Sequence, residues 1–339
     1  MNIQSAIKSV IARHDLSQQE MTAVMNQIMT GECTPAQIGG FLIGMRMKGE
    51  TVDEITAAAT VMRELSTRVK VDVDHLVDTC GTGGDASGSF NISTASAIVT
   101  AAAGAHVAKH GNRSVSGATG SADVLEAAGV NLNIMPEQVA ECISEVGVGF
   151  MFAQKHHGAM RHAIGPRKEM AVRTIFNVLG PLTNPAGAPN QVIGVFDKEL
   201  VEPLARVLGQ LGSEHVMVVH SEDGMDEVSV SAATHVAELK NGEVKTYTVS
   251  PSDFGLELTD ITSLKVETVD ESLAMIRSVL ANTPGAARDI VCVNAGAAIY
   301  VSGIADSWLA GVQMAQSVVA NGKAAKVLQN LVEKSNSYE

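Results

Sequence analysis

The sequence predicts an α/β protein, in which a small amino-terminal α-helical domain precedes a larger domain with a mainly parallel central sheet flanked by helices. Two observations lead to this prediction. Residues 1–70 carry only helix signals, and from His75 onward short apolar segments alternate with helical ones. The expected domains are therefore 1–70 and 71–339, and a helix at 167–185 is expected to join them.

The amino-terminal helices are predicted by their start signals. Each candidate start pairs a hydroxyl residue with a glutamate three positions later, or places proline at the first helical position: Ser17 with Glu20, Thr51 with Glu54, and Thr34 before Pro35. Apolar residues repeat at helical spacing between these signals, which predicts a small bundle. These apolar stripes form a core, part of which can instead be a subunit interface.

The remaining elements follow from apolar runs and turn residues. Expected strands are 75–80, 105–110, 148–152, 191–196, 215–220 and 290–295, and Asn241-Gly242 predicts a hairpin. Expected helices are 93–103, 121–128, 136–145, 167–179, 199–208 and 270–281, followed by closing helices from Trp308 and Lys323.

Charge and cysteine usage exclude several classes of function. The formal net charge of −13 disfavours nucleic acid or an anionic membrane surface as a partner, because both need a basic face. The four cysteines form no C-x-x-C pair, which predicts reduced thiols. The sequence contains no run of about 20 apolar residues, so no membrane-spanning helix is predicted. The pattern H-E-x-x-H of many zinc sites is absent. We expect a cytoplasmic protein.

Two loops of small residues predict anion binding. The stretch KHGNRSVSGATGSAD (109–123) offers basic side chains and a backbone open to a ligand, and GTGGD (81–85) follows the preceding strand. A single loop of this kind is more often merely flexible. Two such loops after neighbouring strands favour a phosphate site.

A third loop adds carboxylates. SEDGMDEV (221–228) also follows a strand, and ligands of parallel sheets bind beyond the carboxyl ends of the strands. Adjacent acids on a loop are usually only solvated. Opposite two phosphate loops, however, Asp226 and Glu227 are well suited to hold Mg²⁺.

Two other patterns have competing interpretations. Gly81, Gly83 and Ala86 fit a weak dinucleotide fingerprint, but the next strand ends in Lys109 and His110 rather than in the acid that a dinucleotide ribose needs. Three histidines with two arginines suggest a pocket for a carboxylate, although any one histidine is more often a buried structural residue: His156, His157, His162, Arg161 and Arg167.

Taken together, the motifs resemble those of the anthranilate phosphoribosyltransferase family of tryptophan biosynthesis. Those that carry the resemblance are GTGGD, NIST (91–94), KHGNRSVSG, GSAD (120–123), VGFMFAQKHHGAMRHAIGPRKEM (148–170), NVLGPLTNPAG (177–187) and MDEV (225–228). Ser89 stands where relatives often have threonine, and it keeps the hydroxyl.

The resemblance implies Mg²⁺-dependent transfer of a phosphoribosyl group from phosphoribosyl pyrophosphate to the amine of anthranilate, with two metal ions and a homodimer formed through the helical domain. It implies catalytic roles for Lys109, His110 and Asn112, and metal binding by Ser93, Asp226 and Glu227. Anthranilate would meet Asn112 and Arg167, with His110, His157 and Gly180 nearby.

The resemblance also implies a set of substrate-binding residues: Gly81, Gly84, Asp85, Ser89, Asn91, Ile92, Ser93, Thr94, Lys109, Gly111, Asn112, Arg113, Ser114, Val115, Ser116, Gly117 and Ser121. Those that would hold the phosphoribosyl donor are Gly81, Gly84, Asp85, Ser89, Asn91, Ser93, Thr94, Lys109 and Ser121. Two alternatives remain, a pyrimidine nucleoside phosphorylase of the same fold and a non-catalytic relative that binds nucleic acid. A phosphorylase would need neither pyrophosphate-binding metals nor a carboxylate clamp, and the net charge disfavours the second alternative.

Overall fold

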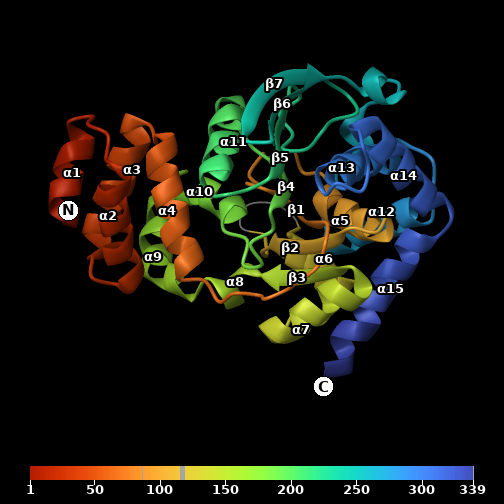
Figure 1. The fold of residues 1–339 in the computed structure, drawn as a ribbon, viewed down its shortest axis with the longest axis horizontal. Helices are drawn as coiled ribbons and strands as arrows, with labels where there is room; N and C mark the ends of the chain where they lie inside the picture. The colour runs from red at the N-terminus through yellow and green to blue at the C-terminus, as the bar shows by residue number, and fades with distance from the viewer. Residues whose placement is uncertain (86, 115–118, 339) are drawn as a thin grey trace.

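The computed structural model describes residues 1–85, 87–114 and 119–338. Four helices form the amino-terminal bundle at one end of the molecule (Figure 1): α1 (Ile3–Ile11), α2 (Gln18–Thr30), α3 (Pro35–Lys48) and α4 (Val52–Glu64). The predicted capping boxes of α2 and α4 are both present, and Thr34 caps α3 in the same way. The predicted fold class is confirmed.

A seven-stranded sheet forms the centre of the larger part, in the order β3-β2-β1-β4-β5-β6-β7. Its strands are β1 (Leu76–Gly81), β2 (His106–Gly111), β3 (Val148–Phe152), β4 (Asn190–Gly194), β5 (His215–Ser221), β6 (Thr234–Lys240) and β7 (Glu243–Val249). The first five are parallel, whereas β6 and β7 form the predicted antiparallel hairpin. The carboxyl ends of β1, β2 and β5 therefore share one edge of the sheet.

Helices cover both faces of this sheet. The α-helices that follow the bundle in the chain are α5 (Ile92–Ala102), α6 (Ser121–Ala127), α7 (Pro136–Glu141), α8 (Ala153–His156), α9 (Arg161–Met170), α10 (Phe176–Leu179), α11 (Val201–Gln210), α12 (Val269–Leu280), α13 (Ala286–Val301), α14 (Trp308–Ala320) and α15 (Lys323–Ser335). The helix expected at 136–145 divides into α7 and a π-helical turn, Cys142–Val146. Of the helices in the described residues, none combines the length and apolarity needed to cross a membrane.

The sequence prediction was wrong in two places. The run expected as a strand at 290–295 lies inside α13, which is buried along most of its length. Buried strands and buried helices are both apolar all round, so periodicity cannot separate them. The helix expected at 167–179, and at 167–185 as the link between the domains, is interrupted: α9 includes Gly165 and Pro166, ends at a left-handed Ala171 (φ 51°), and is followed by the short α10.

The core of the bundle continues into one face of the sheet. Residues of α1 to α4 share an apolar cluster with α11 and with alternate strand residues such as Val216 and Val218. The intervening Met217 and Val219 face a second cluster that includes α13 and α14. The apolar stripes of the bundle are therefore largely buried within the chain itself.

Candidate active site

The predicted loops meet at the carboxyl edge of the sheet. Pairing between β1 and β2 ends at Val77 and Val107, although both strands continue to pair with their outer neighbours. The buried Asp78 lies at this opening, where its carboxylate accepts from the backbone N–H of His110 (3.2 Å) and from Asn184 Nδ2 (2.7 Å). Side chains thus replace ladder hydrogen bonds where the strands separate.

Lys109 lies inside this opening rather than on an exposed loop. Its ammonium donates to the backbone oxygen of Thr79 (2.6 Å) and to Ser93 Oγ (3.3 Å), and the residue is 3% exposed. Burial lowers the pKa of Lys109, and the nearby carboxylate of Asp78 opposes that shift. The lysine therefore places its ammonium group between the end of β1 and the start of α5.

Three carboxylates gather beside it. One oxygen from each of Asp85, Asp226 and Glu227 lies within 4.8 Å of the others. Asp226 Oδ2 accepts from the backbone N–H of Gly83 (2.9 Å), while Asp85 Oδ2 and Glu227 Oε2 are buried and accept no hydrogen bond from the described residues. Burial raises the pKa of Asp226 and of Glu227, and the neighbouring carboxylates raise both further. Carboxylate oxygens that accept no hydrogen bond are available as ligands, and Mg²⁺ prefers oxygen ligands of this kind.

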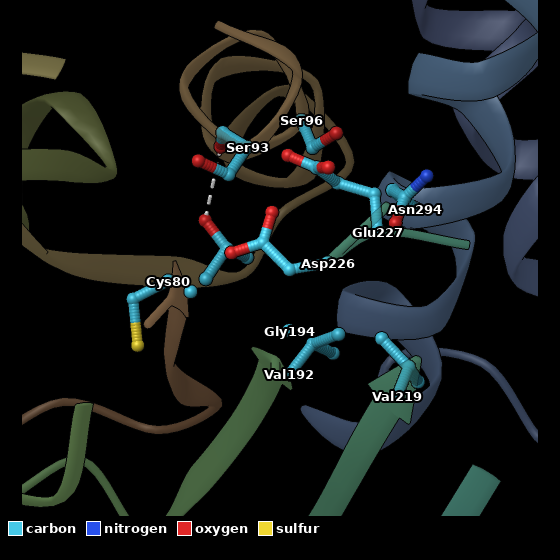
Figure 2. A pocket seen from close by; sticks show the side chains of 11 residues that line it. Cys80, Ser93, Ser96, Val192, Gly194, Val219, Asp226, Glu227 and Asn294 are labelled. Atoms are coloured by element: carbon cyan, nitrogen blue, oxygen red, sulfur yellow. Dashed lines mark hydrogen bonds between the residues drawn. The ribbon is translucent and has the colours of Figure 1, made fainter. Parts of the chain in front are cut away.

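The sequence assigned Asp85 to the donor, and the structure brings it to the predicted metal acids as well. Figure 2 shows the side chains of Ser93, Asp226 and Glu227 around one pocket. Ser93 reaches it from the first turn of α5, which begins directly after the loop that follows β1. The predicted metal ligands are therefore close together.

The start of α5 contains the other donor residues predicted in this region. Asn91 precedes the helix and donates from Nδ2 to Thr119 Oγ1 (2.7 Å), which links it to the glycine-rich loop after β2. Ile92 is buried, and the buried Thr94 Oγ1 has no hydrogen-bond partner among the described residues. Backbone N–H groups in the first turn of a helix are free to bind an anion.

The glycine-rich loop after β2 is packed closely at both ends. A β-carbon on Gly111 would lie 2.2 Å from Ser121 Oγ, and that hydroxyl donates to the backbone oxygen of Asn112 (3.3 Å). Only glycine fits at position 111 without displacing its neighbours. The predicted ligand residues Val115, Ser116 and Gly117 lie outside the described residues, as does Ala86 of the dinucleotide pattern.

Arg113 points toward α6 and not toward the carboxylates at the carboxyl edge of the sheet. Its guanidinium donates to Asp123 Oδ1 (2.9 Å) and to both oxygens of Glu126. The second oxygen of Asp123 accepts from the backbone N–H groups of Ser114 and Gly120, each at 3.0 Å. Asp123 thereby connects the two ends of the loop.

The three histidines are divided between different surroundings. His110 and His157 meet through their Nε2 atoms at 3.2 Å. Burial is the main cause that lowers the pKa of His110 to about 3 and that of His157 to about 4, so both rings are neutral at pH 7.

The other two members of the histidine cluster lie elsewhere. The buried His156 shares a 2.7 Å contact between Nδ1 and the backbone oxygen of Thr67, in the segment that follows the bundle. His162 packs against Gly31 at the end of α2. The interpretation of all three histidines as one pocket is therefore corrected, because α9 starts at Arg161 and turns His162 toward the bundle.

Two arginines lie on the segment after these histidines. Arg167 is partly buried in α9, and its Cζ atom is 5.2 Å from the centre of the Phe176 ring. Arg173, which the sequence analysis did not single out, donates to the backbone oxygen of Gly84 and lies 4.1 Å from the centre of the Phe196 ring. The interruption between α9 and α10 lets Arg173 reach the loop after β1.

Two further predicted residues, Ser89 and Gly180, lie in the loop after β1 and directly after α10. Ser89 forms an isolated bridge with Lys265, and its hydroxyl lies 3.0 Å from that of Ser87. Gly180 follows α10, and a β-carbon there would meet open space. Neither contact assigns a role by itself.

The sequence analysis did not identify several residues that lie at the carboxyl edge of the sheet. Asp78 and Asn184 brace the opening between β1 and β2, and Asn294 from α13 lines the pocket with the acids (Figure 2). Asp78 stands three residues before GTGGD and offered a weak signal. Asn294 offered none, since the segment around it was expected to be a strand.

Comparison with known proteins identifies relatives over the full chain. Residues 73–325 match the "Glycosyl transferase family, a/b domain", and residues 4–66 match its helical bundle domain. Anthranilate phosphoribosyltransferase from Thioalkalivibrio sulfidiphilus is 68% identical over 98% of each chain, and the one from Methylococcus capsulatus is 58% identical over 100% of this chain and 99% of that one.

Solved structures agree with this result. The crystal structure of anthranilate phosphoribosyltransferase from Thermus thermophilus has a TM-score of 0.93 at 42% identity, covering 98% of this chain and 99% of that one. The Saccharomyces cerevisiae enzyme in complex with PRPP and Mg has a TM-score of 0.89 at 24% identity, covering 99% of this chain and 98% of that one.

Proposed function

The chain belongs to the anthranilate phosphoribosyltransferase family, and we propose from this premise how its residues serve the reaction of that family. The enzyme transfers the phosphoribosyl group of 5-phosphoribosyl 1-pyrophosphate to the amine of anthranilate and releases pyrophosphate. The observation that carries the assignment of residues is the cluster of Asp85, Asp226 and Glu227 on the same sheet edge as two phosphate-type loops.

The donor side is proposed to lie over β1, β2 and the start of α5. Backbone N–H groups after β1 and at the first turn of α5 suit phosphate oxygens, and Thr94 offers a buried hydroxyl without a partner among the described residues. Breaking the ribosyl bond develops negative charge on pyrophosphate. The fixed cation of Lys109 lies beneath that charge and stabilises it without reorganising.

Mg²⁺ is proposed to bind between the donor and the acidic loop. Asp226, Glu227 and Ser93 are its proposed ligands, and Asp85 is close enough to contribute a further oxygen. The resemblance implies two ions, and we propose the same number here because three carboxylates gather at this place. Mg²⁺ would neutralise the oxygens of the departing pyrophosphate.

The acceptor side is proposed to lie around His110, His157 and Arg167. A pair of neutral imidazoles presents no cation to repel the positive charge that develops at the sugar carbon. Arg167 is suited to the carboxylate of anthranilate, with Asn112 and Gly180 nearby. The amine of anthranilate is nucleophilic in its neutral form, so no covalent enzyme intermediate is needed, and positioning of the two substrates carries most of the catalysis.

Three broader expectations remain proposals. We propose domains at 1–70 and 71–339, with α9 and α10 returning to pack against α2, α3 and α4. A homodimer through the bundle is proposed from the resemblance and from exposed apolar side chains on α1 and α3. A cytoplasmic location is proposed for an enzyme of amino-acid biosynthesis.

One assay tests the proposed reaction and its metal dependence together. Anthranilate fluorescence should fall only when phosphoribosyl pyrophosphate and Mg²⁺ are both present. Loss of fluorescence without any divalent cation would contradict the metal proposal. Consumption of thymidine with inorganic phosphate, and no consumption of anthranilate, would point instead to a nucleoside phosphorylase.

A further inference from the structure

Asn294 lies in the middle of α13 and holds the residue that follows the metal acids. Its Oδ1 accepts from the backbone N–H of Val228 (2.9 Å), and its Nδ2 donates to the backbone oxygen of the same residue (2.9 Å). Nδ2 also donates to the backbone oxygen of Ile290 (2.8 Å), and the residue is 6% exposed. One side chain therefore fixes both polar groups of one residue in the loop.

The same helix also sets the position of α5. Ser96 Oγ donates to the backbone oxygen of Val291 (3.4 Å), and Thr100 Oγ1 donates to that of Ala295 (3.5 Å). These contacts repeat one turn apart on both helices. Because α5 begins beside Ser93, α13 is the common support of the hydroxyl and of the carboxylates around the pocket (Figure 2).

The acidic loop needs such support because its charges repel one another. Asp85, Asp226 and Glu227 place three carboxylates within 4.8 Å, and like charges at this distance favour an outward movement of the loop. On one side, the backbone N–H of Gly83, in the loop after β1, donates a hydrogen bond to Asp226. On the other side, the two hydrogen bonds of Asn294 fix Val228, the residue that follows Glu227 in the chain.

We propose that Asn294 is a positioning residue that presets Asp226 and Glu227 for the divalent cation. This inference rests on the proposed metal role of those acids. Residues that orient metal ligands without touching the metal change metal affinity about 10- to 100-fold when they are replaced. Replacing Asn294 should therefore weaken the binding of Mg²⁺ and leave the binding of anthranilate unchanged.

The variant Asn294→Ser isolates the contact with Val228. A serine hydroxyl in a helix bonds the backbone oxygen four residues earlier, so the bond to Ile290 is replaced while Val228 is released. We expect the Mg²⁺ concentration for half-maximal rate to rise about 10-fold, with the KM for anthranilate unchanged. Calorimetry should show weaker binding of phosphoribosyl pyrophosphate at limiting Mg²⁺ and near-normal binding at saturating Mg²⁺.

Two controls separate positioning from a general loss of stability. Asn190→Ser makes the same change at a buried asparagine at the start of β4, where Nδ2 donates to the backbone oxygen of Leu76. Trp308→Phe removes a 3.0 Å hydrogen bond to Val293, the residue next to Asn294. Both should lower the melting temperature and leave the Mg²⁺ dependence unchanged.

The outcomes are distinguishable. Wild-type Mg²⁺ dependence in Asn294→Ser, or an equal shift in Asn190→Ser, would overturn the inference. If Asn294→Ser does not fold, Asn294→Thr keeps the helix hydroxyl and gives the same comparison. A double variant, Asp226→Asn with Glu227→Gln, checks the premise: if it folds and keeps wild-type Mg²⁺ dependence, the metal assignment itself is wrong.

Discussion

Asp226 occupies the space that a side chain at Gly81 would need. A β-carbon on Gly81 would lie 2.5 Å from Asp226 Oδ2. The backbone of Asp226 lies even closer to β4, because a β-carbon on Gly194 would overlap its carbonyl oxygen. The acidic loop therefore rests directly on the ends of two neighbouring strands, and both strand ends must be glycine.

Gly81→Ala tests whether this close packing matters for the metal. The added methyl group would displace the carboxylate of Asp226 from its present position, because contacts below 3.0 Å force a neighbour to move. We expect turnover to fall at least 10-fold, with partial recovery at high Mg²⁺, since a displaced ligand binds the metal more weakly. Steady-state rates across a Mg²⁺ titration measure this.

The control for that variant is Gly40→Ala in the middle of α3, where the nearest atom to an added β-carbon would be Ile7 Cδ1 at an ordinary contact distance of 3.9 Å. It should stay fully active and be slightly more stable, because alanine favours a helix by about 1 kcal/mol over glycine. If Gly81→Ala kept wild-type rates at every Mg²⁺ concentration, Asp226 could move without consequence and its proposed role would fail.

Much of the fold could be predicted because its signals are local. Capping residues determined where α2, α3 and α4 begin, and Asn241-Gly242 determined the β6–β7 hairpin. The errors arose where the local signal is ambiguous. The segment of α13 around Val291 is apolar on every side, so only its packing between α5 and α14 makes it a helix.

The site was predicted as a set of loops but not as a geometry. Because parallel strands end at the same edge of a sheet, the three loops could be predicted to lie close together. The directions of the side chains depend on tertiary packing, which the sequence does not display. Lys109 turns inward to Thr79, Arg113 turns to Asp123 and Glu126, and the support from Asn294 comes from a distant helix.

The proposed homodimer can be tested on two exposed apolar side chains of the bundle. Ile11 on α1 and Met47 on α3 are each 69% exposed, while the helical stripes around them are already buried within the chain. We expect Ile11→Glu or Met47→Glu, made singly, to yield a monomer in sedimentation at micromolar concentration. A charge in a buried interface is costly.

Leu258→Glu provides the comparison, because Leu258 is 73% exposed but belongs to the α/β part. It should leave the mass of the assembly unchanged. A wild-type protein that sediments as a monomer would contradict the proposal outright.

The neutral state of His157 predicts a specific dependence of stability on pH. Burial, then the nearby His156, lowers the pKa of His157 in the folded chain to about 4, below about 6.5 in an unfolded one. Between these values the unfolded state binds more protons. The stabilising contribution is therefore complete above pH ~6.5 and is lost as the pH falls toward ~4, at up to about 1.4 kcal/mol per pH unit for one proton.

His157→Gln should flatten that slope in urea unfolding measured across this range without Mg²⁺. His110 contacts this ring through Nε2, and His157 helps to lower the pKa of His110, so the difference reports the titration of the His110–His157 pair. His14→Gln, which changes an exposed histidine, should leave the slope as it is. Parallel slopes for wild type and His157→Gln would contradict the prediction, because they would show that this pair binds protons over the same pH range in the folded and unfolded states.

Arg167 provides the sharpest test of the acceptor site. Burial lowers the pKa of its guanidinium, and within the described residues no carboxylate lies in ion-pair range of it. A partly buried cation without a counter-charge is suited to bind one from a ligand. A charge-assisted contact of about 1.5–3 kcal/mol predicts that Arg167→Ala lowers kcat/KM for anthranilate roughly 10- to 150-fold.

The KM for phosphoribosyl pyrophosphate should change little, because Arg167 is proposed to bind the other substrate, anthranilate. Arg161→Ala, at the exposed start of the same helix, is the matched control and should keep the activity. The guanidinium of Arg167 also lies over the ring of Phe176, so its loss can lower the melting temperature for a purely structural reason. Both kinetics and melting must therefore be measured on one preparation: unchanged anthranilate kinetics with a lowered melting temperature would assign Arg167 to packing and leave the carboxylate of anthranilate to another residue.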